Sequence, residues 1–317
     1  MKKMFFLVAF CLTSFEIFAS EDKVNMAKEG YVNVQGGKIW FQIYTNNDNP
    51  HTMPIIILHG GPGTPHNYLL NLSKLVKYRT VIFYDQLGCG KSSIQNNQKE
   101  LWTITRFVSE LEELAQALEL PQFHLYGHSW GGSLAIEYAL LYPKKVKSMI
   151  LASPVLSVPL WLKDTKQLLQ QLPLSIQQII IEHEEAVTTD SAEYQDAKKM
   201  FNNLLCRLES VPENVQYSLN HSNSEVYQTM WGPSEFTVTG NLKNFDRIND
   251  LVKLTMPILM TCGRFDEAAP ETMQYAKHKS INAKLVIFEK SAHVPHVEEE
   301  EKYLSLLVNF LDNVEKS

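Results

Sequence analysis

Cysteine is scarce in this sequence, with four residues among 317: Cys11, Cys89, Cys206 and Cys262. Cys11 falls in an N-terminal segment that we expect to be removed, and the three remaining thiols cannot all pair. Their spacing matches no zinc-binding pattern, so neither a disulfide scaffold nor a metal site is expected. Cys89 and Cys262 stand beside predicted strand ends, where a buried thiol packs as a small apolar side chain.

Positive charge is also limited, because 29 Lys and Arg residues face 35 Asp and Glu residues, for a formal net charge of −6. This balance gives no electrostatic reason to expect a nucleic-acid partner, and it disfavours attraction to anionic membranes. Beyond the first twenty residues no apolar run is long enough for a transmembrane helix, and we find no internal repeat. The apolar share of 44% is that of an ordinary globular protein with a full core.

The first twenty residues have the layout of a secretory signal peptide. Lys2 and Lys3 precede a short apolar run at residues 4–12, and Ala19 and Ser20 precede a charged segment. We therefore predict a signal peptide over residues 1–20 and a periplasmic or secreted mature protein without membrane contact after cleavage. The bulky residues just before Ala19 keep an alternative open, in which an uncleaved apolar N-terminus belongs to a cytoplasmic protein.

Strand and helix patterns alternate over most of the chain. A Gly-Gly hairpin and several continuous apolar runs predict strands at residues 31–34, 39–43, 54–58, 80–84, 123–126, 146–152, 257–262 and 284–288. Helical spacing of apolar residues predicts helices at 104–118 and 133–141, one from about 270, and a last helix through 311. Such alternation is typical of a mostly parallel sheet with helices on both faces.

The alternation stops in the middle of the chain. Residues 157–240 are mostly helical in pattern, polar and poor in strand signals. We predict that they form a helical cap inserted into a core of residues 21–156 and 241–317. Together with the motifs described next, this organisation predicts an α/β-hydrolase fold with an inserted helical cap.

Residues 127–131 (GHSWG) fit the G-x-S-x-G nucleophile elbow and lie between a predicted strand and a predicted helix. The turn is so sharp that a side chain at either glycine would clash, and it lifts the Ser129 hydroxyl out of the sheet edge. It also leaves the backbone N–H of Trp130 free near the helix start, where it can donate to an oxyanion. Ser129 is therefore the predicted nucleophile.

A serine nucleophile needs a base that an acid orients, and in this fold the chain order is serine, acid, histidine. Asp266 and His293 follow two later strands, at the sheet edge expected for Ser129. We predict that His293 is the base and Asp266 the acid; His296 and Glu267 are the rival candidates. The two histidines do not suggest a metal pair, because no helix or third ligand supports one.

Two glycine-containing segments follow strands and invite different interpretations. Residues 59–63 (HGGPG) stand where the fold places its second oxyanion donor, and we assign that role to the N–H of Gly61. Residues 87–92 (LGCGKS) imitate a phosphate-binding loop, but Asp85 stands where that loop needs a glycine. We therefore expect a tight turn there, and no nucleotide or other cofactor.

The motifs HGGPG (59–63), DQLGCGKS (85–92) and GHSWGG (127–132) together resemble the proline iminopeptidases. The segment MWGPSEFTVTG (230–240) is closer to the tricorn-interacting aminopeptidase branch, and the resemblance extends from about Gly30 to the last helix. It implies an α/β-hydrolase that releases an N-terminal residue, often proline, from short peptides, with Ser129, Asp266 and His293 as its triad. The apparent signal peptide departs from many relatives.

The same resemblance assigns the substrate's ammonium group to Glu235, in the 230–240 motif, and to Glu267, beside the triad acid. Two carboxylates in a closed pocket would recognise a free N-terminus and exclude internal peptide bonds. Three functions remain open: a serine aminopeptidase, an esterase or amino-acid amidase with the same machinery, and a silent binding protein. The intact triad order and both oxyanion elements disfavour the last.

Overall fold

The computed structural model describes residues 28–48, 51–95 and 99–316. The predicted signal peptide at residues 1–20 therefore lies outside the described residues. Within the described ranges no helix combines the length and apolar character needed to cross a bilayer.

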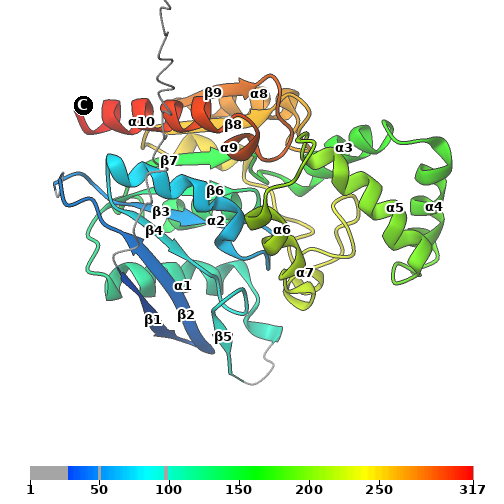
Figure 1. Ribbon diagram of the computed structural model, residues 1–317, viewed down its shortest axis with the longest axis horizontal. Helices are drawn as coiled ribbons and strands as arrows, with labels where there is room; N and C mark the ends of the chain where they lie inside the picture. The colour runs from blue at the N-terminus through cyan, green and yellow to red at the C-terminus, as the bar shows by residue number, and fades with distance from the viewer. Residues whose placement is uncertain (1–27, 49–50, 96–98, 317) are drawn as a thin grey trace, which may run out of the picture.

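A mostly parallel sheet forms the centre of the molecule, with strand order β1-β2-β4-β3-β6-β7-β8-β9 and β5 paired to β2 (Figure 1). The pairs that involve β1, β2 and β5 are antiparallel, and all others are parallel. The strands are β1 (Lys28–Val34), β2 (Gly37–Tyr44), β3 (Ile55–Leu58), β4 (Val81–Tyr84), β5 (Ser93–Ile94), β6 (Phe123–His128), β7 (Val146–Ala152), β8 (Ile258–Gly263) and β9 (Ala283–Phe288).

Helices cover both faces of this sheet because its central strands are apolar on both sides. In β3, Ile56 and Leu58 pack into the core formed with α1 (Ile104–Ala117), α2 (Trp130–Leu141) and α8 (Pro270–Lys279). Ile55 and Ile57 pack on the opposite face against η1 (His66–Lys77) and α10 (Glu300–Lys316). Short elements η2 (Lys99–Leu101), η4 (Ile248–Lys253) and α9 (Pro295–Glu298) complete this part of the chain.

The chain between β7 and β8 is helical and extends to one side of the sheet (Figure 1). Leu168, Ile180, Phe201 and Phe236 belong to a small apolar core of its own. This segment contains α3 (Val158–Leu169), α4 (Leu174–Glu185), α5 (Ala192–Asn202), η3 (Asn203–Leu205), α6 (Glu213–Asn220) and α7 (Ser224–Met230).

Most predicted strands and helices are confirmed, including the hairpin of β1 and β2 and the fully buried β3. Helix α2 differs, since it begins at Trp130 rather than at residue 133. Gly131 and Gly132 are weak helix formers and concealed the first turn. Their small size is required by packing, because a Cβ on Gly131 would lie 2.4 Å from the carbonyl oxygen of Leu58. Residues 66–77, for which no element was predicted, form the 3₁₀ helix η1.

Candidate active site

Ser129 occupies the sharp turn between β6 and α2. Its φ of 55° and ψ of −121° are strained for a residue with a side chain, and such strain often accompanies function. The turn is held because the Ser129 N–H donates to the Ala152 carbonyl at 2.9 Å and the Ser129 carbonyl accepts from Gly132 and Val155. A Cβ on Gly127 would lie 2.2 Å from the Gly131 carbonyl oxygen, so only glycine fits there.

His293 and Asp266 meet at the carboxyl edge of the sheet, after β9 and β8. His293 Nδ1 lies 2.8 Å from Asp266 Oδ1, and this carboxylate also accepts from the N–H groups of Gly263 at 3.1 Å and Ala268 at 3.0 Å. The acid is thus fixed by three donors, and it orients the imidazole. Among the described residues no hydrogen bond joins the Ser129 hydroxyl to His293.

The second imidazole nitrogen of His293 faces a different carboxylate. His293 Nε2 lies 3.5 Å from Glu267 Oε1, and Glu267 is only 2% exposed. Burial by itself would lower the pKa of His293, but the negative charges of Glu267 and Asp266 outweigh it and raise that pKa to about 9. The resting site therefore favours a charged imidazole balanced by acids on both sides.

Glu235 approaches the same region from the helical segment between β7 and β8. Its Oε1 accepts a hydrogen bond from the Tyr227 hydroxyl at 2.6 Å. Burial raises the pKa of Glu235, and burial together with the charge of Glu235 raises the pKa of Glu267 well above its ordinary value. Glu267 Oε2 has no hydrogen-bond partner among the described residues. This pair of acids therefore has an unused capacity to bind a cation.

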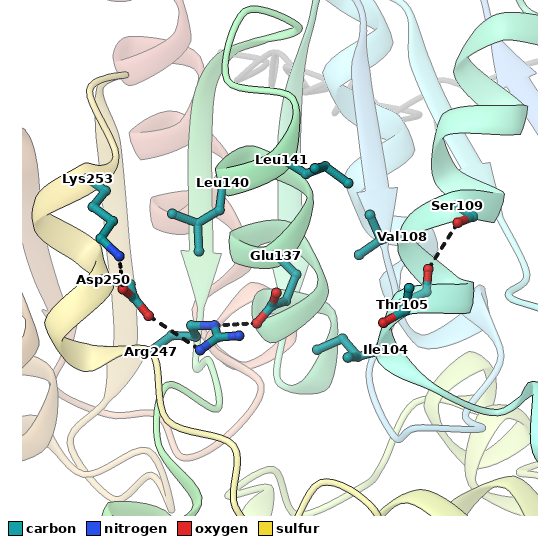
Figure 2. Close-up of a pocket in the computed structure, with 10 residues that line it drawn as sticks. All are labelled: Ile104, Thr105, Val108, Ser109, Glu137, Leu140, Leu141, Arg247, Asp250 and Lys253. Carbon is teal, nitrogen blue, oxygen red and sulfur yellow. Dashed lines mark hydrogen bonds and ion pairs between the residues drawn. The ribbon is translucent and has the colours of Figure 1, made fainter.

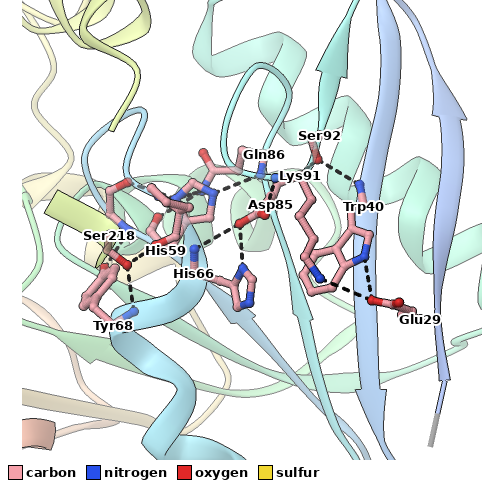
Figure 3. A network of polar contacts seen from close by, with 12 residues as sticks. Glu29, Trp40, His59, His66, Tyr68, Asp85, Gln86, Lys91, Ser92 and Ser218 are labelled. Atoms are coloured by element: carbon pink, nitrogen blue, oxygen red, sulfur yellow. Dashed lines mark hydrogen bonds and ion pairs between the residues drawn. The ribbon is translucent and has the colours of Figure 1, made fainter. Parts of the chain in front are cut away.

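Gly61 and Trp130, the two predicted oxyanion donors, lie on segments joined by Gln86. The Gln86 side chain donates to the His59 carbonyl at 2.9 Å and accepts from the Trp130 indole at 2.8 Å. The Gln86 N–H donates to His59 Nε2 at 2.9 Å, so His59 Nδ1 carries the proton that it donates to the Gly60 carbonyl at 3.0 Å. The Gly60 carbonyl and the Gly61 N–H belong to the same planar peptide group, so this hydrogen bond also fixes the direction of the Gly61 N–H. Figure 3 shows His59 and Gln86.

The backbone N–H groups of Gly61 and Trp130 themselves are available for a ligand. No described residue accepts from the Gly61 N–H, and the residue has a φ of 109° that favours glycine. Trp130 is the first residue of α2, where a helix leaves its N–H groups unpaired. These properties suit two donors to a negatively charged oxygen.

The segment that imitates a phosphate-binding loop forms a turn over residues 87–91, which directly follows Asp85 (Figure 3 shows Asp85 and Lys91). The Asp85 carboxylate accepts from the His66 N–H at 3.0 Å, His66 Nδ1 at 2.8 Å and the Lys91 N–H at 2.8 Å. Burial would raise the pKa of Asp85, but its contacts with His66 outweigh that effect and lower it. Asp85 thus stabilises the loop that carries Gln86.

Comparison with known proteins identifies the family. A model of the alpha/beta hydrolase fold matches residues 53–300. Over 291 residues the chain is 48% identical to a proline iminopeptidase of Heyndrickxia coagulans, and the match covers 91% of this chain and 100% of that relative. The chain belongs to the proline iminopeptidase family. The predicted fold and the resemblance noted in the sequence are thereby confirmed, and the chain is a serine hydrolase of this type.

Further matches agree with this family and with its fold. One from Saccharolobus solfataricus is 37% identical over 292 residues, covering 90% of this chain and 93% of that relative. The crystal structure of a proline iminopeptidase of Mycobacterium smegmatis has a TM-score of 0.82 and 33% identity, covering 90% of this chain and 98% of that one. The crystal structure of VinJ has a TM-score of 0.86 and 31% identity, and the match covers 92% of this chain and 100% of that one.

The geometry distinguishes the candidates that the sequence left open for this family member. His296 is fully buried, neither of its ring nitrogens has a partner among the described residues, and burial lowers its pKa to about 3. It is poorly placed to act as a base. Glu267 lies on the Nε2 side of His293, whereas Asp266 contacts Nδ1, so the geometry favours Asp266 as the orienting acid.

Sequence reasoning missed several residues of the site. The Trp161 ring centroid lies 5.9 Å from that of His293, and Tyr227 binds Glu235. Both lie on helices between β7 and β8, where no motif distinguishes a residue that faces the site from one in the apolar core. His128 occupies a variable position of the elbow motif, yet its ring centroid lies 4.7 Å from that of His293.

A surface hollow of about 480 Å³ lies apart from these residues (Figure 2). It is lined by side chains of α1, α2 and the η4 region, and its Arg247 side chain is paired with Glu137 and Asp250. None of the site residues described above lines it. Over the described ranges there is no cluster of three or more His, Cys, Asp or Glu residues that could hold a metal ion.

Proposed function

We propose that this serine hydrolase is an aminopeptidase that releases an N-terminal residue, proline or a small apolar residue, from short peptides. The observation that carries the proposal is the pair of Glu235 and the buried Glu267 near His293, in which Glu267 Oε2 has no hydrogen-bond partner among the described residues. Two carboxylates, one of them with a free oxygen acceptor, suit the ammonium group of a free N-terminus. The names of the relatives, proline iminopeptidase, support the same substrate class.

Proline fits two acids for a simple chemical reason. Its N-terminal nitrogen is a secondary ammonium with two N–H donors, and Glu235 and Glu267 offer one carboxylate to each. An internal peptide nitrogen carries no charge and would leave both acids unpaired in a buried site. We therefore infer that the acids restrict cleavage to the first peptide bond.

The proposed chemistry assigns Ser129 as nucleophile, His293 as base and Asp266 as the acid that orients it. His293 Nε2 takes the Ser129 proton as the hydroxyl attacks the scissile carbonyl, and the N–H groups of Gly61 and Trp130 stabilise the oxyanion. His293 then returns the proton to the leaving amine. An ester of Ser129 remains, and water hydrolyses it by the same steps.

Ammonium binding would also prepare the base. In the resting site His293 Nε2 faces Glu267 at 3.5 Å, and the surrounding acids raise its pKa to about 9. A substrate ammonium between Glu235 and Glu267 would neutralise much of that negative charge. The pKa of His293 would then fall toward its ordinary value, and the neutral imidazole could turn to Ser129.

A panel of aminoacyl chromogenic amides tests this function. Proline, alanine and leucine amides are compared with their N-acetylated forms and with a simple ester that has no amine. We expect kcat/KM to be highest for a free proline or small apolar residue and to collapse on acetylation. Equal turnover of free and acetylated amides would contradict an aminopeptidase and favour the esterase or amidase alternative.

We further propose that residues 157–240 act as a cap on a core of residues 21–156 and 241–317. Support comes from the separate apolar core of α3–α5, which the sheet does not share. Amides of α4 and α5 should then exchange with solvent at lower opening free energy than those of β6 and β7. Equal protection in both parts would contradict a separate cap.

Finally, we propose that the mature protein begins near Glu21 and works in the periplasm or outside the cell. The support is the basic start, the short apolar run and the small residues at Ala19 and Ser20. N-terminal sequencing of the protein from its native host tests it. A retained Met1 on protein recovered from the cytoplasm would refute it.

A further inference from the structure

Three loops of the site are joined by one chain of hydrogen bonds. The Gly60 N–H donates to the Tyr68 hydroxyl at 2.8 Å. The Tyr68 hydroxyl lies 2.9 Å from His128 Nδ1, and His128 Nε2 lies 2.8 Å from the carbonyl oxygen of His293. The chain thus runs from the oxyanion loop, through the residue before Ser129, to the backbone of the proposed base.

The two ends of this series of hydrogen bonds determine which atom donates in each bond. A backbone N–H can only donate, so the Tyr68 oxygen accepts from Gly60 and its own proton is available for His128 Nδ1. A backbone carbonyl can only accept, so His128 Nε2 must carry the proton that it donates to His293. Neutral His128 protonated at Nε2 satisfies both demands, and no other neutral tautomer does.

The surroundings keep His128 in that form. His128 is 2% exposed and Tyr68 is 6% exposed, and the His128 ring packs 4.7 Å from that of His293 and 5.1 Å from that of His296. Burial, assisted by the charge of the neighbouring His293, lowers the pKa of His128 well below its ordinary value. A second proton on Nδ1 would moreover remove the acceptor for Tyr68.

We propose that His128 is a positioning residue, which fixes the backbone of His293 to the nucleophile elbow and, through Tyr68, to the oxyanion loop. His128 is covalently next to Ser129, so its bond to the His293 carbonyl sets the base relative to the nucleophile. The His293 N–H is held from the other side by the Leu205 carbonyl at 3.0 Å. The proposal rests on the serine mechanism given above.

Variants of His128 and Tyr68 test the positioning role through kcat. His128→Leu removes the donor to His293, whereas His128→Gln keeps an amide N–H that can reach the same carbonyl. We expect His128→Leu to lower kcat by about tenfold or more, the rate equivalent of one buried hydrogen bond, with KM little changed. His128→Gln should recover most of kcat, and Tyr68→Phe should fall between them.

Matched controls separate positioning from stability. His124 lies on the same strand and is fully buried, with ring contacts to Ser148 at 2.7 Å and Glu315 at 2.9 Å. Tyr126 is also buried on that strand, and its hydroxyl contacts that of Tyr303. His124→Leu and Tyr126→Phe should lower Tm without lowering kcat per active molecule, counted by a phosphonate that labels Ser129.

Nitrogen NMR of the imidazoles provides a reading that does not depend on folding of any variant. In the wild-type protein His128 should remain neutral, with its proton on Nε2, over about pH 5 to 8. A His128 that titrates in that range, or carries its proton on Nδ1, would overturn the proposal. So would unchanged kcat in His128→Leu and Tyr68→Phe. Wild-type protein that the phosphonate fails to label would instead refute the serine mechanism.

Discussion

Replacing Glu267 with glutamine changes the charge beside the proposed base with little change of shape. Glu267 Oε1 lies 3.5 Å from His293 Nε2, and Glu267 is 2% exposed. Burial would lower the pKa of His293, but the charge of Glu267, together with the charge and hydrogen bond of Asp266, opposes this effect and raises the pKa to about 9. We expect Glu267→Gln to lower the pKa of His293 toward its ordinary value of about 6.5.

The magnitude follows from the same distance. Two unit charges 3.5 Å apart attract by about 5 kcal/mol at an effective dielectric constant of about 20, which is ample for such a change. Protonation of Glu267 for part of the time reduces the effect, because its own pKa is raised by burial and by Glu235. Loss of one carboxylate from the ammonium site should cost about 1.5–3 kcal/mol, or about 10–150-fold in kcat/KM for amine substrates.

The assay compares the pH dependence of kcat/KM for a free proline amide and for an ester without an amine. The base works when neutral, so activity rises with pH through the pKa of His293, and lowering that pKa extends activity to lower pH. Glu267→Gln should therefore gain ester activity near neutral pH and lose amide activity. Glu235→Gln should lose amide activity too, with a smaller change in the ester profile, because Glu235 affects His293 less.

Glu110→Gln is the matched control, since Glu110 is also fully buried but its carboxylate accepts from the Leu87 N–H instead of facing His293. It should leave both pH profiles unchanged. Equal loss of ester and amide activity in Glu267→Gln would show that Glu267 is structural. An unmoved ester profile would show that Glu267 does not control the base.

Three further results are expected. Ser129→Ala should lower kcat by at least about 10⁴-fold while circular dichroism and Tm stay near wild type, and a near-normal rate would refute the serine mechanism. Gln86→Leu removes the side-chain link between His59 and Trp130 and should lower kcat by about 10–100-fold. An unchanged kcat would show that other contacts hold the oxyanion donors in place. Burial raises the pKa of Glu110 to about 8, so the folded state favours the protonated carboxyl. The contribution of this proton to stability is fully present below the unfolded pKa of about 4.5 and is lost as the pH rises through about 8. Glu110→Gln should therefore raise Tm at pH 8 more than at pH 5, and the opposite order would contradict a raised pKa.

Local patterns in the sequence were enough to predict the sheet and the motif positions. Continuous apolar runs such as residues 54–58 predict strands buried on both faces, because only helices on both sides of a sheet can cover them. The elbow at Ser129 was recognisable from glycines that a sharp strand-to-helix turn requires. Chain order then indicated Asp266 and His293, since loops after parallel strands meet at one edge.

Local patterns were insufficient to choose between neighbouring candidate residues, because that choice depends on where each side chain points in the folded protein. Asp266 and Glu267 are adjacent in the sequence, yet one faces His293 Nδ1 and the other faces Nε2. His293 and His296 are three residues apart, yet His293 contacts Asp266, whereas His296 is fully buried and its ring nitrogens have no partner among the described residues.

What the sequence by itself determined was the alternation of strands and helices, and with it the edge where the site assembles. Only the tertiary structure decided which atoms meet there. Gln86 joins His59 to Trp130, and His128 joins Tyr68 to His293, across separations of 27 to 165 residues. The physical reason is that hydrogen bonds between loops leave no repeating pattern in the sequence, unlike helices and strands. They form only when strands that are far apart in the sequence bring their ends together in the fold.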